Sequence, residues 1–404
     1  MDDLHRIRGS ILGLAIGDAL GHPTEFVSSV RAIRESWGEK GVTDLVDVGR
    51  YPAGTFTDDT QMTICVARAL VRKGHASLDE LMDVMGKEFA AWSRSRENNR
   101  APGGTCLAGC RNFASGLGWK EAGVRNSKGC GAAMRAAPLG LYFTTDVAAL
   151  VRLSAAQSSL THRHLTGIAS AVAAAAPVAY ALREKTLDGM LAFTRSCVEK
   201  LDVEALVAAG CDRELAEDIG AREMLAALDA TEEALEEEHE DVCQLLGGAW
   251  IGEEAVATAL WWVIKAKGDF LDAVLRGANS SGDSDSIACI AGSIAGVLAG
   301  IEGVPADWVA RVEKTDMLDK LARALSEART GAGQELPDLD SYGAEKPPEP
   351  LEEADTDPAL PSDEDDDDLD ADDRFNEEED EEDDAPKSEK SGKDDKHGQD
   401  EPKP

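Results

Sequence analysis

The sequence lacks the cysteine pairs of zinc sites and the basic charge of nucleic-acid-binding proteins. None of its eight cysteines forms a Cys-x-x-Cys pair, and Cys106 and Cys110 have no matching pair of cysteine or histidine residues downstream. Only 41 Lys and Arg stand against 78 Asp and Glu, which gives a formal net charge of −37. Because a nucleic-acid backbone and an anionic membrane would both repel such a chain, we expect neither as its main partner.

Long apolar runs are also missing. The most apolar stretch, residues 168–182, spans about 15 residues and is mostly alanine, whereas roughly 20 are needed to cross a bilayer. The N-terminal residues, Met-Asp-Asp-Leu-His-Arg, do not form the basic and then apolar regions of a signal peptide. Together with scattered cysteines that we take to be reduced, these features indicate a soluble, cytoplasmic protein with no membrane partner.

The acidic charge is concentrated at the C-terminal end. Residues 341–404 contain 28 Asp and Glu against seven Lys and Arg, so roughly −21 of the net charge lies there. Almost no apolar residues are present whose burial would compensate for the entropy lost on ordering. We therefore expect one folded domain at residues 1–339 and a disordered acidic tail at residues 340–404. The tail is either a solubilising appendage or a segment that binds basic partners or cations.

The periodicity of the remaining chain is helical. Apolar residues recur with a spacing of three and four in residues 4–14, 62–70, 81–92 and 256–263, and alternating strand patterns are nearly absent. Abundant alanine also favours helix over strand. The predicted fold class is all-α, with breaks at the glycine-rich and proline-rich residues 38–54, 98–104, 116–131 and 303–305.

Two of the predicted helices carry a glycine at every fourth position. The first contains Gly9, Gly13, Gly17 and Gly21, and the second contains glycines at positions 292, 296 and 300. Each glycine costs about 1 kcal/mol of helix propensity, a cost that is tolerated where another backbone must approach closely. We expect these two helices to pack tightly, and possible partners include each other.

The first segment whose residues are suited to metal binding or catalysis follows Gly54. Thr57, Asp58, Asp59 and Thr60 open a predicted amphipathic helix. A structural role is available, because Thr57 can serve as an N-cap worth about 1 kcal/mol while the two carboxylates complement the helix dipole. This segment alone does not separate capping from a functional role.

A second segment of the same kind opens the helix with glycines 292 to 300. Asp283, Asp285 and Ser286 follow a turn-forming Ser-Ser-Gly, so this helix too begins with two carboxylates and hydroxyl groups. Capping needs only one oxygen, whereas four carboxylates brought together repel one another unless cations neutralise them. An all-oxygen set of ligands suits Mg²⁺, Mn²⁺ or Ca²⁺. A shared metal site explains both segments.

Five motifs in a fixed order resemble one known family. They are Gly9-Ser-Ile-Leu-Gly-Leu-Ala-Ile-Gly-Asp-Ala-Leu-Gly, Thr57-Asp-Asp-Thr, Gly129-Cys-Gly-Ala-Ala-Met-Arg, Thr161-His162 and Gly282-Asp-Ser-Asp-Ser. In this order they resemble the ADP-ribosylglycohydrolase family, which includes the bacterial dinitrogenase-reductase-activating glycohydrolase. The resemblance runs from about Ile7 to about Pro305 and is weakest at residues 203–240.

The resemblance implies a compact orthogonal helical bundle with two divalent cations, Mg²⁺ or Mn²⁺, in a cleft. The metal ligands carried over from the family motifs are Thr57, Asp58, Asp59, Asp283, Asp285 and Ser286. The position of Ser286 is threonine in many members, and either hydroxyl can ligate. Two such cations would orient ribose hydroxyls and lower the pKa of a bound water. Glu25 or Asp59 would take the proton from that water, and both are kept as candidate catalytic residues.

The substrate-binding residues implied by the resemblance lie between the two acidic segments. A glycine-rich turn that enters a helix can present backbone N–H groups to a diphosphate. The residues expected to contact pyrophosphate, phosphate or ribose are Gly129, Cys130, Gly131, Ala132, Ala133, Met134 and His162. Without the resemblance, the turn would be read as a packing feature and His162 as a core or capping residue.

The implied activity is hydrolysis of an ADP-ribosyl bond, and the acceptor is open. The sequence Arg100-Ala-Pro-Gly-Gly-Thr lacks an acidic residue that the nitrogenase-regulating branch carries there, and Glu97 is only nearby. We favour ADP-ribosyl-arginine on a protein as substrate. The alternatives are ADP-ribosyl-serine, free ADP-ribose derivatives, ADP-ribosylated nucleobases, or a non-enzymatic protein that binds ADP-ribose or only keeps the fold, like crystallin-like relatives.

Overall fold

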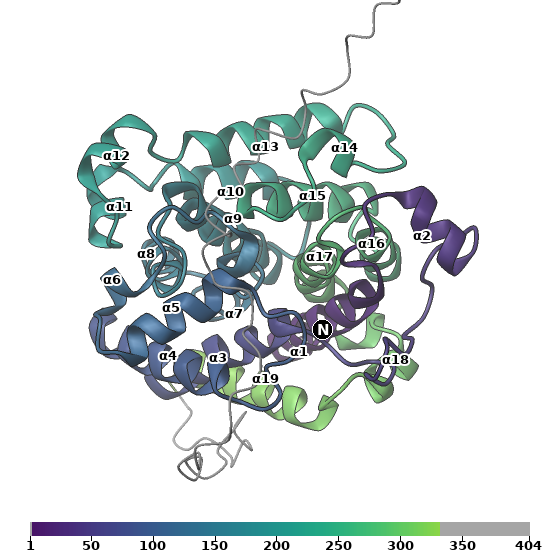
Figure 1. The fold of residues 1–404 in the computed structure, drawn as a ribbon, viewed down its shortest axis with the longest axis horizontal. Helices are drawn as coiled ribbons and strands as arrows, with labels where there is room; N and C mark the ends of the chain where they lie inside the picture. Colours follow the sequence, from purple (N-terminus) through teal and green to yellow (C-terminus); the bar gives the residue numbers. More distant parts are fainter. Residues whose placement is uncertain (1, 332–404) are drawn as a thin grey trace, which may run out of the picture. The chain divides into compact units, whose positions relative to one another are not determined.

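The all-α prediction is confirmed. In the computed structural model, which describes residues 2–331, the chain folds into helices joined by loops (Figure 1), the longest of which runs from residue 38 to residue 57, and the only strand-like contacts in this range are three isolated bridges. The predicted disordered acidic tail and the domain boundary at residue 339 lie outside the described residues. In chain order the helices are α1 (Asp3–Gly21), α2 (Val30–Trp37), α3 (Asp58–Lys73), α4 (Leu78–Ser93), α5 (Gly104–Ala114), α6 (Trp119–Ala122), α7 (Ala137–Tyr142), α8 (Val147–Ser158), α9 (Leu165–Glu184), α10 (Met190–Val198), α11 (Val203–Ala208), α12 (Arg213–Asp218), α13 (Arg222–Ala234), α14 (Cys243–Leu246), α15 (Gly252–Lys265), α16 (Phe270–Ala278), α17 (Ser284–Ala299), α18 (Ala306–Arg311) and α19 (Thr315–Arg329), with 3₁₀ turns η1 (His22–Thr24), η2 (Cys130–Ala132) and η3 (Ile301–Gly303).

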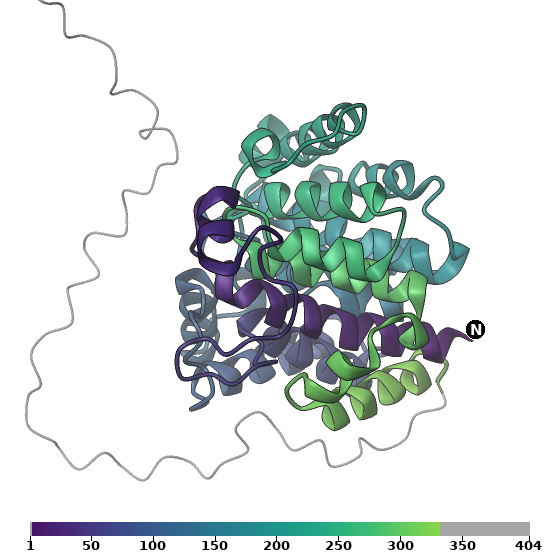
Figure 2. The same ribbon diagram turned by 90° about the vertical axis from the view of Figure 1, so that its right-hand side faces the viewer.

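The two glycine-bearing helices, α1 and α17, pack against each other. Gly9 faces Gly296, Gly13 faces Gly292 and Gly17 faces the Ala288 carbonyl, so the helices run antiparallel. A Cβ atom at any of these glycines in α1 would collide with the backbone of α17. The prediction of tight packing is therefore confirmed, and the partner of each helix is the other. Figure 2 shows α1 running through the middle of the described residues, with α17 on one side and α19 on the other.

The central apolar helix is α9. Among residues 2–331 it is the one helix long and apolar enough to cross a membrane by length and composition, and 94% of its most apolar window is buried inside the protein. The estimate of about 15 apolar residues from the sequence was too short, because flanking residues extend the helix to 20. Helices α7, α8, α10, α15 and α17 pack around it, so its apolar surface is covered by protein.

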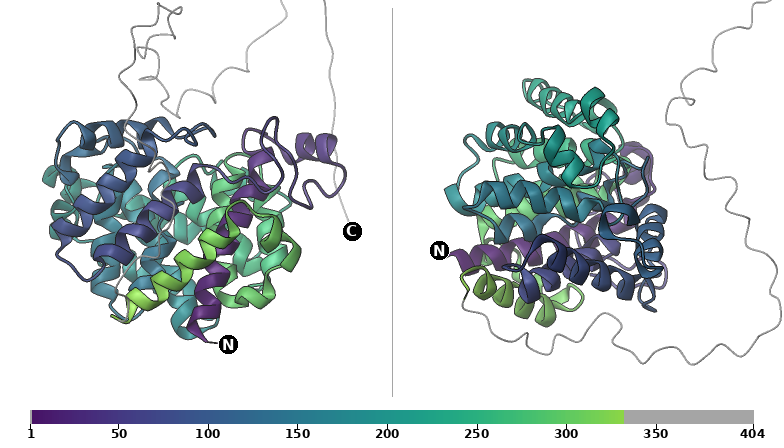
Figure 3. Two further views of the ribbon diagram at one scale, coloured as in Figure 1. Left: turned by 90° about the horizontal axis from the view of Figure 1, so that it is seen from below. Right: turned by 90° about the vertical axis from the view of Figure 1, so that its left-hand side faces the viewer.

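The N-terminus of α3 is fixed by contacts from the C-terminal part of the chain. Gly54 has a φ of +88°, a left-handed conformation that favours glycine. A Cβ atom at this position would also lie only 2.3 Å from the Arg311 carbonyl oxygen. The Glu313 amide donates to the Gly54 carbonyl at 2.9 Å. Helix α19 lies along both α1 and α3 (Figure 3), which holds the start of α3 beside the end of α1.

We expect Gly17→Ala to destabilise the protein by about 2 kcal/mol or more. Alanine would gain about 1 kcal/mol of helix propensity, but its methyl group would meet the Ala288 and Cys289 backbone, which cannot move without separating the helices. Urea unfolding followed by far-ultraviolet circular dichroism measures the change.

The matched control is Gly104→Ala, at the start of α5, where nothing lies within 4 Å of the new Cβ atom. This variant should be as stable as the parent protein. Equal stability of Gly17→Ala and Gly104→Ala would contradict the importance of the close helix contact.

Candidate active site: a buried carboxylate cluster

Six carboxylates converge where α1 ends and where α3 and α17 begin. The antiparallel contact places Asp285, in the first turn of α17, against Gly21, the last residue of α1. The turn η1 follows Gly21, and Glu25 comes directly after it as its C-cap. Each of the six side chains belongs to a buried residue with at most 8% exposure. The members of this carboxylate cluster are Asp18, Glu25, Asp58, Asp59, Asp283 and Asp285.

Direct contacts join the two acidic segments. Thr57 Oγ1 lies 3.1 Å from Asp285 Oδ2, and Ser286 Oγ donates to Asp59 Oδ1 at 2.9 Å. These pairs are separated by 228 and 227 positions in the sequence. The structure therefore brings together all the residues proposed from the motifs as metal ligands, together with Glu25.

Helix capping does not account for the acidic segments. Thr57 and Asp283 occupy the N-cap positions of α3 and α17, but neither side chain caps a backbone N–H of its own helix. The Thr57 hydroxyl points instead to Asp18 at 2.9 Å and to Asp285, while Asp283 accepts a hydrogen bond from the Cys130 thiol at 2.9 Å. The local structural explanation considered for the sequence is thus excluded for these two residues.

Asp18 is a site residue that the motif analysis did not single out. It is fully buried in α1 and accepts hydrogen bonds from the backbone and hydroxyl groups of Thr57 and Thr60, at 2.6–2.9 Å. Asp18 thereby caps α3 from another helix and orients the Thr57 hydroxyl. The available signal was a single carboxylate in the apolar, glycine-bearing part of α1, residues 9–21, because a buried carboxylate requires a partner.

Burial and mutual repulsion keep the cluster from ionising fully. Burial, followed by the charge of Asp285, raises the pKa of Asp18 to about 7, that of Asp58 to about 8 and that of Glu25 to about 11. The same two causes raise the pKa values of Asp59 and Asp283 well above the ordinary range. A neighbouring positive charge would relieve both effects, which is the electrostatic condition for binding cations.

The donor atoms of the cluster fit hard divalent cations. Six carboxylates and the hydroxyls of Thr57 and Ser286 offer only oxygen, the ligand type preferred by Mg²⁺ and Mn²⁺. Within residues 2–331, however, no group of three or more His, Cys, Asp or Glu side chains is arranged to hold a metal ion as it stands. The carboxylates are instead directed to neighbouring hydroxyls, such as Asp59 to Ser286. The donor chemistry supports a metal site, and its occupation remains a proposal.

The glycine-rich turn at residues 129–134 lies beside this cluster. Burial raises the pKa of the Cys130 thiol well above its usual value, so the thiol stays protonated and donates a hydrogen bond to Asp283. The turn was expected to enter a helix, but η2 has only three residues and α7 begins later, at Ala137, with Pro138 in its first turn. A single 3₁₀ turn carries little dipole, so any anion binding here must rely on individual N–H groups.

His162 stands behind the glycine turn as a neutral hydrogen-bond donor. Arg135 Nη2 donates to Thr161 Oγ1 at 2.7 Å, and that oxygen lies 2.8 Å from His162 Nδ1. Arginine only donates, and within the described residues Nδ1 is the only acceptor in reach of the Thr161 hydroxyl, so this hydroxyl donates to Nδ1 and the ring proton lies on Nε2. Burial, with a smaller effect of the Arg135 charge, lowers the pKa of His162 to about 3.

The Nε2–H group of His162 faces the glycine turn. A Cβ atom at Gly129 would lie 3.2 Å from Nε2, and one at Gly131 would lie 2.8 Å from the adjacent ring carbon. Both glycines therefore allow the ring to approach. Within the described residues Nε2 has no hydrogen-bond partner, so it is available to a ligand bound over the turn.

Residues 97–105, where the sequence differs from the nitrogenase-regulating branch, place no acidic side chain in the cluster. Glu97 forms an ion pair with Lys314 at 2.5 Å, and Arg100 pairs with Glu313 at 2.6 Å. The contribution of this loop to the cluster is the Gly103 amide, which donates to Asp58 at 3.3 Å. Glu97 is therefore a poor replacement for the missing acid.

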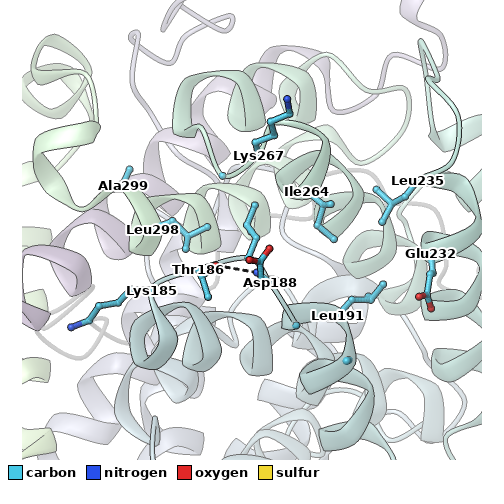
Figure 4. A pocket seen from close by; sticks show the side chains of 14 residues that line it. Lys185, Thr186, Asp188, Leu191, Glu232, Leu235, Ile264, Lys267, Leu298 and Ala299 are labelled. Atoms are coloured by element: carbon cyan, nitrogen blue, oxygen red, sulfur yellow. Dashed lines mark hydrogen bonds between the residues drawn. The ribbon is translucent and has the colours of Figure 1, made fainter.

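A separate cavity of about 860 Å³ lies at the C-terminal ends of α9, α15 and α17, away from both acidic segments (Figure 4). Its lining includes Leu191, Leu235, Ile264 and Leu298, and the amino groups of Lys185 and Lys267 lie at its periphery. No residue of the carboxylate cluster or of the glycine turn lines it. The candidate active site is therefore the carboxylate cluster with the glycine turn, and not this cavity.

Comparisons with known proteins agree with the geometry. The profile of the ADP-ribosylglycohydrolase family matches residues 1–335. The chain is 29% identical to the ADP-ribosylarginine hydrolase Tri1 of Pseudomonas putida, over 80% of this chain and 78% of that protein. It is 25% identical to the ADP-ribosyl-[dinitrogen reductase] glycohydrolase of Rhodospirillum rubrum, over 76% and 90%. A solved ADP-ribosylglycohydrolase-related protein complex has the same fold, with a TM-score of 0.59, 24% identity and coverage of 81% of this chain and 99% of that one.

We expect Thr161→Val to change the tautomer of His162. Valine keeps the shape of threonine but removes the hydroxyl that donates to Nδ1, so the ring proton should no longer be confined to Nε2. The ¹⁵N chemical shifts of selectively labelled histidines report this change, with His162→Gln used to assign the signal.

Thr161→Ser keeps the hydroxyl and should give the parent shifts. Unchanged ¹⁵N shifts in Thr161→Val would show that the Arg135–Thr161 pair does not determine the tautomer.

Proposed function

The chain belongs to the ADP-ribosylglycohydrolase family, and we propose that it removes ADP-ribose from ADP-ribosylated arginine on a protein, using two Mg²⁺ or Mn²⁺ ions. Hydrolysis of a glycosidic bond to ADP-ribose is the activity of the family, and the relatives carry corresponding names. The single observation that supports the mechanism best is the convergence of six buried carboxylates from three separate segments.

The cations would be held by residues from the starts of α3 and α17. Their oxygen ligands would come from Thr57, Asp58, Asp59, Asp283, Asp285 and Ser286. When bound, such ions supply Lewis acidity that lowers the pKa of a water molecule and stabilises negative charge on ribose oxygens. Asp18 would remain a positioning residue, because its oxygens already accept hydrogen bonds from Thr57 and Thr60.

The reaction requires a proton acceptor for water beside the anomeric carbon. Water would form a bond to that carbon, the carbon–nitrogen bond to the guanidino group would break, and the displaced nitrogen would gain a proton, giving ADP-ribose and arginine. Asp59 is occupied by Ser286 and Thr57, whereas Glu25 has no hydrogen-bond partner among the described residues. Glu25 is therefore the better general base, provided that cationic charge brings its pKa down from about 11.

The ADP-ribose moiety would lie over the glycine turn. The Nε2–H group of His162 is an unpartnered donor suited to a phosphate or ribose oxygen, and the small residues of the turn let a ligand approach the backbone. Cys130, Ala132, Ala133 and Met134 connect this surface with the carboxylate cluster. The thiol of Cys130 and the sulfur of Met134 both lie within 4.0 Å of the Ser286 hydroxyl.

The chemical identity of the acceptor is tested by measuring the release of ADP-ribose from defined substrates. The name of the Pseudomonas relative supports an arginine linkage. The alternatives are a serine linkage, free ADP-ribose derivatives and ADP-ribosylated nucleobases. A time course with each substrate, with Mg²⁺, with Mn²⁺ and with EDTA, separates them. A binding protein without catalysis would release none, a possibility that two intact acidic segments disfavour.

We expect Asp58→Asn and Asp283→Asn to lower kcat at least about a hundredfold, because each removes a charged oxygen from the proposed metal site. Both variants should keep the helical circular dichroism spectrum, since neutral side chains relieve repulsion in the cluster. ADP-ribose release from arginine-linked substrate measures the effect. Asp316→Asn, at an exposed position in α19, is the control and should be fully active. Full activity of either cluster variant would eliminate the metal mechanism.

We also expect divalent cations to stabilise the protein more at pH 8 than at pH 5.5. The folded, metal-free protein holds protons with pKa values of about 7 on Asp18 and about 8 on Asp58. The unfolded chain releases these protons near pH 4, so raising the pH through this range destabilises the metal-free fold. Cations replace the protons and should restore the loss.

Thermal unfolding with EDTA and with Mg²⁺ at both pH values gives the two stabilisations. Because Tm with Mg²⁺ and Tm with EDTA are compared at the same pH, the titration of residues outside the cluster affects both values equally. Asp283→Asn keeps the acidic tail and controls for cations bound there. An equal rise of Tm at both pH values, or an undiminished rise in the variant, would argue against cation binding in the cluster.

A further inference from the structure

Asp58 differs from the other aspartates of the carboxylate cluster because a surface loop holds it. Within residues 2–331, the hydrogen bond from another residue to its side chain comes from the Gly103 amide, at 3.3 Å. The other aspartates contact hydroxyl, thiol or backbone groups of the segments that open α3, α17 and η2. Gly103 is exposed and ends the loop of residues 94–103 between α4 and α5. The orientation of Asp58 therefore depends on this loop.

The backbone of the loop is strained just before Gly103. Ala101 has a φ of +47°, in the left-handed region that favours glycine, and it precedes Pro102, which favours an extended conformation in the residue before it. Ala101 is exposed, so burial of its side chain does not hold this conformation. A strained backbone persists only where the surrounding structure fixes it. Contacts elsewhere in the loop must therefore keep Ala101 in place.

Arg100 makes the most extensive of these contacts. Its Nη1 and Nη2 atoms donate to the two carboxylate oxygens of Glu313 at 2.6 and 3.0 Å, and Nη1 also donates to the Phe56 carbonyl at 2.6 Å. A bidentate arginine pair fixes orientation as well as distance. The Arg100 side chain is only 9% exposed, so water screens the ion pair little.

Both partners of Arg100 are tied to the segment that opens α3. Phe56 lies two residues before Asp58. The Glu313 amide donates to the Gly54 carbonyl at 2.9 Å, in the same segment. The arginine therefore fastens the loop to the part of the chain that carries the carboxylate, and the distance between the Gly103 amide and Asp58 is set by this connection.

We propose that Arg100 is a positioning residue for the cation site: by holding the loop against Glu313 and Phe56, it keeps the Gly103 amide on Asp58 and so raises the affinity of the cluster for divalent cations. This inference rests on the proposed function, because it assumes that Asp58 is a metal ligand. A carboxylate that is already oriented loses less freedom when a cation binds, so the benefit is seen in affinity. Arg100 acts through the backbone and contacts neither cation nor substrate.

Three variants separate the geometry of Arg100 from its charge. Arg100→Lys keeps the positive charge but cannot form the bidentate pair, whereas Arg100→Gln removes the charge as well. Glu313→Gln keeps the shape of the partner and removes its charge. The matched control is Arg329→Lys. Arg329 pairs with Asp3 at 2.8 Å with a side chain 17% exposed, at the start of α1, whereas the carboxylate cluster lies at the end of that helix.

Two measurements are made on each full-length variant. Calorimetric titration of the metal-free protein with Mn²⁺ gives Kd, and the same titration of Asp283→Asn identifies ions that bind outside the cluster. The second measurement is the amide proton shift of Gly103. Pro102 and Gly103 form the one Pro-Gly pair in the sequence, so labelling with carbonyl-¹³C proline and ¹⁵N glycine gives a single correlated amide signal.

We expect Arg100→Lys and Arg100→Gln each to raise Kd for Mn²⁺ about tenfold, the lower end of the range for residues that orient a metal ligand. The lower end applies because Gln61 Nε2 still donates to the Glu97 carbonyl at 3.0 Å and holds part of the loop. Glu313→Gln should raise Kd less, since its amide oxygen still accepts a hydrogen bond.

In metal-free protein, the Gly103 amide proton should move upfield in both Arg100 variants as its hydrogen bond to Asp58 lengthens. Arg329→Lys should keep the parent Kd and the parent shift.

Unchanged Kd and an unchanged Gly103 shift in Arg100→Lys would overturn the inference. A rise of Kd in Arg100→Gln alone would also contradict it, because the charge of Arg100 would then be sufficient without the bidentate geometry. An equal rise in Arg329→Lys would indicate general loosening of the fold. A parent protein that binds no Mn²⁺ contradicts the proposed metal mechanism instead, and the Gly103 shift in the metal-free variants then still decides whether Arg100 positions the loop.

Discussion

The close antiparallel contact between α1 and α17 determines where the chemistry can occur. Glycines remove the side chains that would hold the two backbones apart, and the register sets Gly17 against Ala288 and Gly21 against Asp285. A shift of this contact by one helical turn, about 5.4 Å, would carry the start of α17 away from Asp18 and Thr57. The distance between the two acidic segments is thus fixed by helix packing, and the loops that carry them need little rigidity of their own.

Helix packing also has to offset the free energy that the carboxylate cluster costs on folding. Burial, followed by the charge of Asp285, raises the pKa values of the other five carboxylates, and hydrogen bonds from Thr57, Thr60, Ser286 and Cys130 relieve only part of this cost. The apolar helices α9 and α17, which are almost wholly buried, supply compensating burial directly behind the cluster. Protons relieve part of this repulsion in the free protein, and divalent cations that replaced them would relieve more of it, which favours a binding role for the cluster over a purely structural one.

Sequence reasoning succeeded where a periodic or repeated feature carried the information. The glycine spacing in α1 and α17 predicted a close contact, and the duplicated pattern of two carboxylates with hydroxyls predicted a shared site. Asp18 could not be assigned in this way, because one acidic residue in the apolar part of α1 does not reveal which element it faces. The short η2 turn was also missed, since the glycines at 129 and 131 and the proline at 138 delay the helix until Ala137. The contact between the exposed rings of Phe26 and Trp250 has no local signal at all.

The inner and outer parts of the site have different physical requirements. The carboxylate oxygens of Asp59 and Asp285 each contact a second buried group, so a change at one of these positions disturbs several others. At the rim, Phe26 and Trp250 contact each other and solvent, and their replacement leaves the buried contacts in place. The buried set therefore fixes the geometry of the cluster, whereas the rim can change without altering that geometry. Glu97 and Arg100, in the loop before α5, both form ion pairs with residues that precede α19, so this loop contributes to the cluster through the Gly103 amide and not through a charged side chain.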